Sequence, residues 1–174
     1  MTTRLLLSKR ALASIEMDVL AHPLTETGGL LPCRLMGTSM VVPFTIPGGP
    51  AATRSPSRYS PDTAWQQLLL DFAFDQFAVD FGGAWHKHPG LFDQPSAYDV
   101  KTARHIVTDP TWDKASAVFP IAVVDAGRVR LRAYLMQRTT QTFEEIAIEV
   151  IPDSDPRVLE ILGGPRAERE EAAP

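Results

Sequence analysis

Two histidines in the stretch Trp85 to Asp99, "WHKHPGLFDQPSAYD", have the spacing of a metal site. On a β-strand, residues i and i+2 point to the same side, so His86 and His88 would face one space, about 7 Å apart along the chain. Two neutral imidazoles at this spacing can converge on one zinc ion, with Zn–N distances of about 2.0–2.1 Å. The segment "AWHKH" is short and carries an aromatic residue, which favours the strand.

A serine and an aspartate, Ser96 and Asp99, follow after a seven-residue gap. They match a capping box, in which a serine caps a helix and an acidic side chain three residues later bonds back, and that interpretation is purely structural. The same helix start would direct Asp99 towards whatever precedes the helix. With His86 and His88 it would complete a three-ligand site with an open fourth position, a pattern typical of catalytic zinc. Water bound at such a site has a pKa of about 7.

Hydrolysis also needs a proton shuttle that is not a metal ligand. Glu26 is the candidate, because the two glycines that follow shortly after it allow close approach of the backbone to the site. Glu16 is the competing carboxylate, but its place in an amphipathic helix favours a solvated surface. We interpret the other two histidines, His22 and His105, as ordinary polar residues.

The first elements are predicted from the spacing of apolar residues and from residues that cap or stop helices. Residues 8–22 have apolar side chains at helical spacing, with Ser8 as N-cap and Pro23 as the stop. Residues 28–47 contain two short apolar runs separated by "MGTS", which predicts a hairpin. Pro32 and Pro43 within those runs favour edge positions or bulges.

Residues 47–60 are rich in Pro, Gly and Ser and predict a long irregular loop. Arg54, Arg58 and Tyr59 in this segment are candidates for substrate contacts, or simply part of a solvated loop.

A helix is expected next, with three consistent start signals: Ser60 as N-cap, Pro61 at the first helical position and Asp62 in the first turn. We expect it to end at Gly82 and Gly83. Its apolar stripe is interpreted as core packing, and consists of Leu70, Phe74, Phe77 and Phe81.

The remaining segments predict a helix over 96–107 closed by Asp109 and Pro110, and a hairpin that turns at 125–127. "TFEEIAIEVI" alternates like one strand, and a last short helix is capped by Gly163. Helices and strands are interspersed while consecutive strands are hairpin-linked. The sequence therefore predicts an α/β or α+β fold, with one domain over 1–164, a mixed β-sheet flanked by helices, and a disordered acidic tail over 165–174.

Composition narrows the function classes. The chain has 174 residues and a net charge of −4, which argues against general nucleic-acid binding. No apolar run reaches the roughly 20 residues of a membrane span, and the N-terminus lacks the apolar core of a signal peptide. The one cysteine, Cys33, excludes an internal disulfide, so we expect a reducing, cytoplasmic location and a buried thiol.

The motif resembles that of the JAB/MPN metalloprotease family, also called JAMM. The family pattern matches Glu26 before a Gly-Leu strand, His86-Lys87-His88-Pro89, and Ser96-Ala97-Tyr98-Asp99. The element order resembles the family over about residues 5–140. Two departures are Lys87, where the family commonly has Ser or Thr, and Pro32-Cys33, where a Gly is more usual. Lys87 should point to the opposite side of the sheet from the histidines.

The resemblance implies that His86, His88 and Asp99 bind Zn²⁺. It also implies that Glu26 moves a proton from the attacking water to the leaving amine, and that Ser96 donates a hydrogen bond to the oxyanion. The implied substrate is a ubiquitin-like protein or its conjugates, cut after the C-terminal glycine by a bacterial deubiquitinase-like isopeptidase. Such members are encoded beside activating and conjugating enzymes, including those of antiviral operons.

Three alternatives remain open. The domain could release an amino acid from a sulfur-carrier protein, or it could be a non-catalytic MPN-like scaffold. Two histidines and a carboxylate can also hold Fe(II) in an oxygenase.

Overall fold

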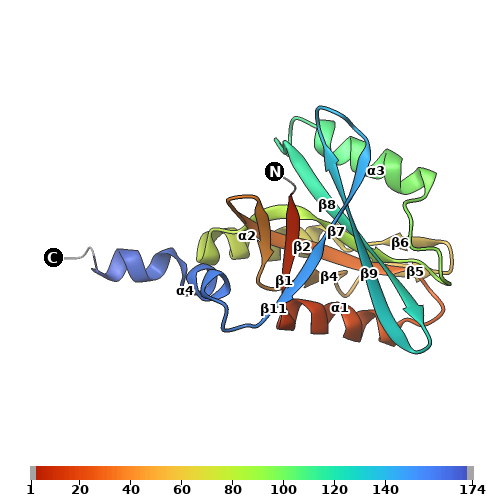
Figure 1. The fold of residues 1–174 in the computed structure, drawn as a ribbon, viewed down its shortest axis with the longest axis horizontal. Coiled ribbons are helices and arrows are strands. Elements are labelled where there is room, and N and C mark those ends of the chain that lie inside the picture. Colours follow the sequence, from red (N-terminus) through yellow and green to blue (C-terminus); the bar gives the residue numbers. More distant parts are fainter. Residues whose placement is uncertain (1–2, 172–174) are drawn as a thin grey trace.

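The structure, a computed structural model, describes residues 3–171, and within that range nine strands form one sheet (Figure 1). The strands of this sheet are β1 (Arg4–Ser8), β2 (Thr27–Met36), β3 (Ser39–Val42), β4 (Ile46–Pro47), β7 (Asp80–Lys87), β8 (Ser116–Asp125), β9 (Arg128–Gln137), β10 (Phe143–Ile146) and β11 (Ile148–Ile151). A separate small hairpin consists of β5 (Thr53–Ser55) and β6 (Arg58–Ser60). The helices are α1 (Lys9–Ala21), α2 (Thr63–Phe77), α3 (Ala97–Thr108) and α4 (Pro156–Glu171).

The large sheet is mixed, as expected, with the strand order β10-β9-β8-β7-β2-β3-β1-β11 and β4 beside β2. The pairs β7–β8, β1–β3 and β1–β11 are parallel, and the others are antiparallel. "TFEEIAIEVI" is two strands and not one, because β10 pairs with β9 while β11 pairs with β1. Ala147 alone separates them, so the two ends of the strand order lie close together and the sheet must curl.

Helices cover both faces of the curled sheet. Helix α1 packs its buried residues Ala11, Ile15 and Val19 against one face, which includes Leu31 and Trp85. The opposite face packs against α2 and α3, through Leu70, Ala103, Val107, Phe81, Ala117, Phe119 and Met136. In Figure 1, α1 lies below the sheet and α3 above it. Within residues 3–171, no helix combines the length and apolar composition that crossing a membrane requires.

Helix α1 and the following hairpin confirm the predictions made for them. Ser8 caps α1 by accepting a hydrogen bond from the Ala11 N–H at 3.1 Å, and the helix ends at His22. Strands β2 and β3 form the hairpin, and the pairing of β2 with β7 changes register between Leu30 and Pro32, where β7 has one extra residue. Pro32 is not at an edge, because β2 has β7 on one side and β3 and β4 on the other.

Helix α2 differs from its prediction at both ends. Asp62 is the N-cap and accepts from the Trp65 N–H, because Ser60 belongs to β6 and pairs with Thr53. The helix ends at Phe77, where Ala78 adopts a left-handed conformation, and Gly82 and Gly83 lie in β7. A Cβ at Gly83 would lie 1.7 Å from the Val118 carbonyl oxygen, so this glycine permits close strand approach.

Three further predictions need correction. Phe74 is 57% exposed and is not a core residue, whereas Phe81 is buried but comes from β7. The segment 47–60 is not wholly irregular, since it contains β4, β5 and β6. Helix α4 does not end at Gly163 but continues past Gly164 and Pro165 to Glu171, and residues 166–171 are good helix formers. Part of the expected tail therefore belongs to α4, and residues 172–174 lie outside the described residues.

Candidate metal centre

Strand β7 presents its two histidines on one face of the sheet. His86 lies in β7, and His88 follows its last residue but keeps strand geometry, because its N–H donates to the Ala122 carbonyl of β8 at 3.0 Å. Lys87 points to the opposite face, as expected, where α1 packs. The histidines therefore face the α3 side of the sheet, where the acidic partner could reach them.

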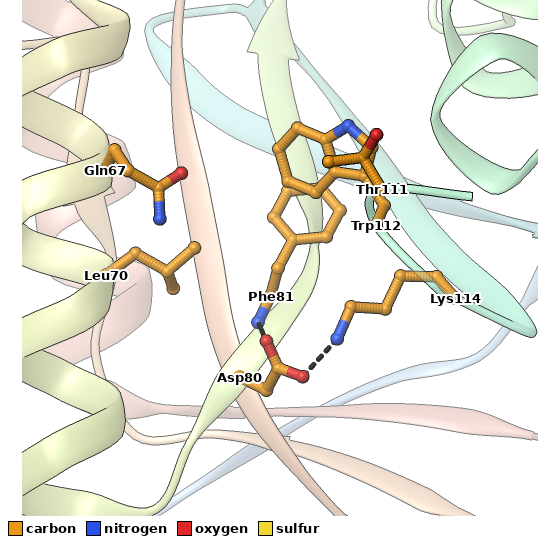
Figure 2. A pocket seen from close by; sticks show the side chains of 7 residues that line it. All are labelled: Gln67, Leu70, Asp80, Phe81, Thr111, Trp112 and Lys114. Atoms are coloured by element: carbon orange, nitrogen blue, oxygen red, sulfur yellow. Dashed lines mark hydrogen bonds and ion pairs between the residues drawn. The ribbon is translucent and has the colours of Figure 1, made fainter. Parts of the chain in front are cut away.

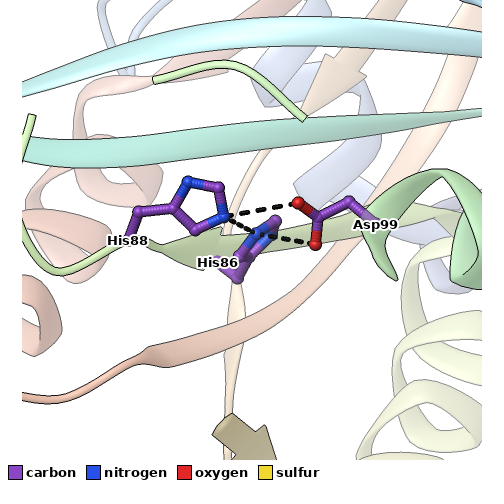
Figure 3. Close-up of side chains that lie close together, drawn as sticks. All are labelled: His86, His88 and Asp99. Carbon is purple, nitrogen blue, oxygen red and sulfur yellow. Dashed lines mark hydrogen bonds and ion pairs between the residues drawn. The ribbon is translucent and has the colours of Figure 1, made fainter. Parts of the chain in front are cut away.

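Helix α3 delivers that partner through its first turn. Ser96 and Asp99 form the predicted capping box: the Ser96 N–H donates to Asp99 Oδ2 at 2.6 Å, and the Asp99 N–H donates to Ser96 Oγ at 3.2 Å. The box fixes the rotamer of Asp99 while its carboxylate faces the histidines (Figure 3). The capping and ligand interpretations are thus compatible, because one carboxylate can serve both contacts.

Three potential ligand atoms meet at this point. The Nε2 atoms of His86 and His88 lie 2.8 Å apart, and they lie 3.2 Å and 3.3 Å from the two Asp99 oxygens (Figure 3). Ligands held about 2.0–2.1 Å from a tetrahedral zinc ion are separated by about 3.3 Å. The donor set and spacing fit zinc after a small widening between the imidazoles. In the described part of the chain, this is the one group of three or more such side chains close enough to share an ion.

A backbone contact orients His88. Its Nδ1 lies 2.8 Å from the Phe92 carbonyl oxygen, so Nδ1 carries the proton that it donates and Nε2 is left facing the centre. The Phe92 ring stacks on the imidazole, with centroids 5.9 Å apart and planes 13° apart. This is the usual outer contact of a metal-binding histidine.

The charges at the centre are strongly coupled. Burial alone would raise the pKa of Asp99, but the hydrogen bonds from His86 and His88 hold it well below the ordinary value. Burial would lower the pKa of His88, yet its bonds to Asp99 and to the Phe92 carbonyl raise the pKa overall, and the negative charge of Glu26 adds to the rise. The site is therefore built around an ionised carboxylate that attracts positive charge.

Glu26 comes to the same region from the neighbouring strand. Thr27 pairs with Lys87 and Gly28 with His86, so Glu26, one residue earlier, lies beside His88 at the end of the β2–β7 pair. Alternation places Glu26 on the histidine face, and its N–H donates to the Ser55 carbonyl at 2.9 Å. The competing carboxylate, Glu16, belongs to α1 on the opposite face of the sheet.

Ser96 lies at the start of α3, adjacent to the ligand that it caps. Its Oγ accepts a hydrogen bond from the Asp99 N–H, and a hydroxyl that accepts one bond still has its own proton to donate. The arrangement thus leaves an O–H donor beside the candidate ligands. The structure brings His86, His88 and Asp99 into contact, with Glu26 and Ser96 on the elements that border them.

Sequence reasoning missed the contacts that hold the loop between β7 and α3. Asp93 in this loop accepts from Arg132 at 3.1 Å and pairs with Arg130 at 3.7 Å. The Tyr134 hydroxyl donates to the Asp93 carbonyl at 2.8 Å. Strand β9 thereby anchors the loop whose Phe92 carbonyl orients His88. Charged residues so far apart in the chain leave no local pattern that could have revealed them.

The small β5–β6 hairpin is hydrogen-bonded to the start of β2. The Tyr59 hydroxyl donates to the Gly28 carbonyl at 2.8 Å, and Arg54 Nε donates to Thr27 Oγ1 at 2.9 Å. Asp18 accepts from the Thr27 hydroxyl at 2.5 Å. Arg54 and Tyr59, two candidates for substrate contacts, thus bond within the protein, whereas Arg58 is exposed.

Lys87 lies between the two histidines, where the sequence gives no reason for a lysine. Its side chain is fully buried, and Nζ donates to the carbonyl oxygens of His22, Pro23 and Thr25 at 2.5, 2.9 and 3.0 Å. Burial lowers the pKa of this ammonium. All three acceptors lie in the segment that connects α1 to β2, immediately before Glu26.

A hollow with a volume of about 410 Å³ opens at the end of β7 away from the histidines (Figure 2). Phe81 and Trp112 pack there with ring centroids 4.7 Å apart, and Asp80 forms an ion pair with Lys114. Asp80 is the first residue of β7, whereas the histidines lie at its end. The hollow is therefore separate from the candidate metal centre, and its other lining residues are Gln67, Leu70 and Thr111.

Comparison with known proteins supports the fold alone. No family model and no curated protein matches the chain. Among solved structures, the chain is similar to the solution structure of protein DSY2949 from Desulfitobacterium hafniense, with a TM-score of 0.66 and 20% sequence identity. The similarity covers 85% of this chain and 93% of the other. The chain thus shares an architecture that occurs in a bacterial protein.

Proposed function

We propose that the protein is a zinc-dependent peptidase or isopeptidase of the JAB/MPN type, which cleaves after the C-terminal glycine of a ubiquitin-like protein. The observation that carries the proposal is the meeting of His86, His88 and Asp99, whose ligand atoms lie 2.8–3.3 Å apart. The position of Glu26 beside His88 supports it, because a scaffold needs no carboxylate there.

Each residue of the site has its own role in the proposed hydrolysis. Zinc, when held by the two imidazoles and the carboxylate, supplies the Lewis acidity that makes a nucleophilic water available near neutral pH. Glu26 accepts a proton from the attacking water and returns it to the leaving amine. Ser96 donates its hydroxyl proton to the oxyanion that develops on the scissile carbonyl. Asp99 keeps its place through the capping box during these steps.

Exposed apolar side chains around the centre support a protein substrate. Leu91, Phe92 and Tyr98 are 60%, 57% and 69% exposed, and they belong to the loop and helix that carry the ligands. Apolar side chains gathered beside a polar centre are typical of a surface that binds another protein. An extended C-terminal tail with small final residues could reach the centre by pairing with a strand edge.

The proposed partners are the ubiquitin-like protein, its conjugates and the activating and conjugating enzymes that attach it, as in bacterial antiviral conjugation systems. Genes beside this one that encode such enzymes would favour deconjugation. Sulfur-assimilation genes would instead favour release of an amino acid from a sulfur-carrier protein.

The proposal is tested with purified, zinc-loaded protein and linear fusions of ubiquitin-like proteins that end in Gly-Gly, read by mass spectrometry. We expect cleavage after the last glycine, and loss of cleavage when a chelator removes zinc. Glu26→Gln should keep zinc yet lose turnover by at least about 100-fold, whereas the matched variant Glu16→Gln should behave as wild type.

Three outcomes would overturn the proposal. Stoichiometric iron in place of zinc would indicate an oxygenase. Absence of any bound metal would indicate a scaffold. Cleavage by Glu26→Gln at the wild-type rate would remove the assigned proton shuttle.

A further inference from the structure

We propose that Lys87 is a positioning residue for Glu26: its buried ammonium holds the α1–β2 connection so that the Glu26 carboxylate stays beside the metal ligands. The inference rests on the proposed function, since it assigns a role to the proton shuttle of that same site. Lys87 itself does not touch the centre, because it points to the opposite face of the sheet.

The hydrogen bonds of Lys87 connect strand β7 to the segment between α1 and β2. A lysine ammonium has three donors, and here each meets a different carbonyl, from His22, Pro23 and Thr25. His22 is the C-cap of α1, and carbonyls at a helix C-terminus have no partner within the helix. The positive charge is also favourable at this negative end of the helix dipole. Lys87 thus supplies a charged donor to carbonyls just beyond α1, and one of them, from His22, also accepts a longer bond of 3.4 Å from the Thr25 N–H.

The hydrogen bonds of Lys87 restrain the backbone of the α1–β2 connection. A buried ammonium without hydrogen-bond partners is costly, so the α1–β2 connection cannot move away from Lys87 without exposing or orphaning the charge. Thr25, the last acceptor, is covalently bonded to Glu26. The backbone of Glu26 is also held on its other side by the Ser55 carbonyl. Both restraints therefore act on the single peptide unit that joins Thr25 to Glu26, one on its carbonyl and one on its N–H.

Lys87 also lies between the two histidine ligands in the chain. Its Cα partner across the β2–β7 pair is Thr27, the residue after Glu26. One side chain therefore connects the strand that carries the ligands to the segment that carries the proton shuttle. This explains why a lysine stands between the histidines, a position that never faces the metal.

The first test compares Lys87→Met with Lys101→Met, an identical change at an exposed site on α3. Hydrogen exchange followed by mass spectrometry needs no substrate. We expect faster exchange in peptides covering 22–27 of Lys87→Met, with unchanged exchange in peptides covering 96–105. Zinc content should remain one per chain in both variants. Unchanged exchange over 22–27 would overturn the proposal, even if the protein cleaved no substrate tested.

The second test separates positioning from general damage. With a fusion that the wild type cleaves, Lys87→Met should lower kcat by about 10- to 100-fold, because a shift of about 1 Å at the shuttle has that cost, while KM stays within about twofold. If Lys87 acts through Glu26, then adding Lys87→Met to Glu26→Gln should change kcat by less than about twofold. Multiplicative losses in the double variant would overturn the assignment.

A folding defect in Lys87→Met would not end the test. Lys87→Arg keeps the charge and has enough donors, but its rigid fork cannot place them on three carbonyls as the lysine does. We expect Lys87→Arg to fold and bind zinc, with a smaller loss of kcat and the same localised increase in exchange. Loss of zinc from Lys87→Arg, with exchange over 22–27 unchanged, would instead place its role in holding β7.

Discussion

Gly28 lies directly opposite His86 in the antiparallel pair of β2 and β7. A Cβ atom added to Gly28 would lie 2.5 Å from the Trp85 carbonyl oxygen, 2.9 Å from the Tyr59 ring and 3.2 Å from His86 Cβ. Strand β2 therefore approaches the histidine strand more closely than any larger residue allows. Because Glu26 is two residues before Gly28, this close approach also sets how near Glu26 comes to the candidate metal ligands.

Gly28→Ala should displace β2 from β7, because one of the three contacts is to backbone and cannot rotate away. Overpacking of this kind lowers the free energy of unfolding by about 1–3 kcal/mol. Urea unfolding of the metal-free protein measures the loss. The control is Gly163→Ala, where a Cβ meets nothing within 4 Å in helix α4, and the stability should rise by about 0.5–1 kcal/mol. Equal stabilities for Gly28→Ala and wild type would contradict the packing described.

If zinc binds as proposed, removal of a single candidate ligand should abolish tight binding. His88→Ala and Asp99→Asn each leave two ligands of the three that meet at the centre. Asp99→Asn is preferred to alanine, because an amide oxygen can still accept the N-cap bond and preserve the start of α3. Calorimetric titration with zinc is the measurement, and His105→Ala, an exposed histidine on α3, is the control. Stoichiometric zinc in either ligand variant would show that the ion is held elsewhere.

Elements with strong local signals could be predicted from the sequence. Ser8 and Pro23 bound α1, and the Ser96–Asp99 capping box begins α3, because capping depends only on residues three apart. The prediction for helix α2 is wrong at both ends, since Ser60 pairs with Thr53 in β6, and Gly82 and Gly83 lie in β7 in close contact with β2 and β8 respectively. The glycine contacts depend on residues about 35–50 positions away in the chain, which no local pattern encodes, whereas Ser60 belongs to a short hairpin that was expected as irregular loop.

In the candidate site too, the features with local sequence signals could be predicted and those held by long-range contacts could not. The i, i+2 spacing of His86 and His88 and the helix start before Asp99 are local, and the structure brings these three side chains together. The restraints around them are not local: Lys87 reaches carbonyls 62–65 residues away in sequence, and Tyr134 reaches Asp93 across 41 residues. Alternation predicted which face Lys87 occupies, but only the fold shows what it binds there.

Tyr134→Phe should loosen the loop that orients His88. The variant loses the hydrogen bond to the Asp93 carbonyl, at a cost of about 1 kcal/mol in unfolding free energy. Since Phe92 is the neighbouring residue and its carbonyl holds His88, zinc affinity should fall by up to about 10-fold. Competition with a chromophoric chelator measures the affinity. Tyr98→Phe, at an exposed position, should leave both stability and zinc affinity unchanged. An unchanged zinc affinity in Tyr134→Phe would show that the loop keeps its position without β9.

Cys33 should be unreactive in the folded protein although it is a free thiol. Burial raises its pKa to about 12, so almost no thiolate forms at pH 8. A disulfide reagent at pH 8 should label Cys33 only after urea is added, and Cys33→Ala serves as the blank.

The raised pKa of Cys33 also makes the free energy of unfolding depend on pH in the alkaline range. Between the ordinary thiol value of 9.0 and about 12, the unfolded chain has released a proton that the folded protein keeps. The free energy of unfolding should therefore fall as pH rises through that range. Rapid labelling at pH 8 without denaturant would show that the packing around Cys33 opens readily, and with it the β2–β7 pair on which the candidate centre depends.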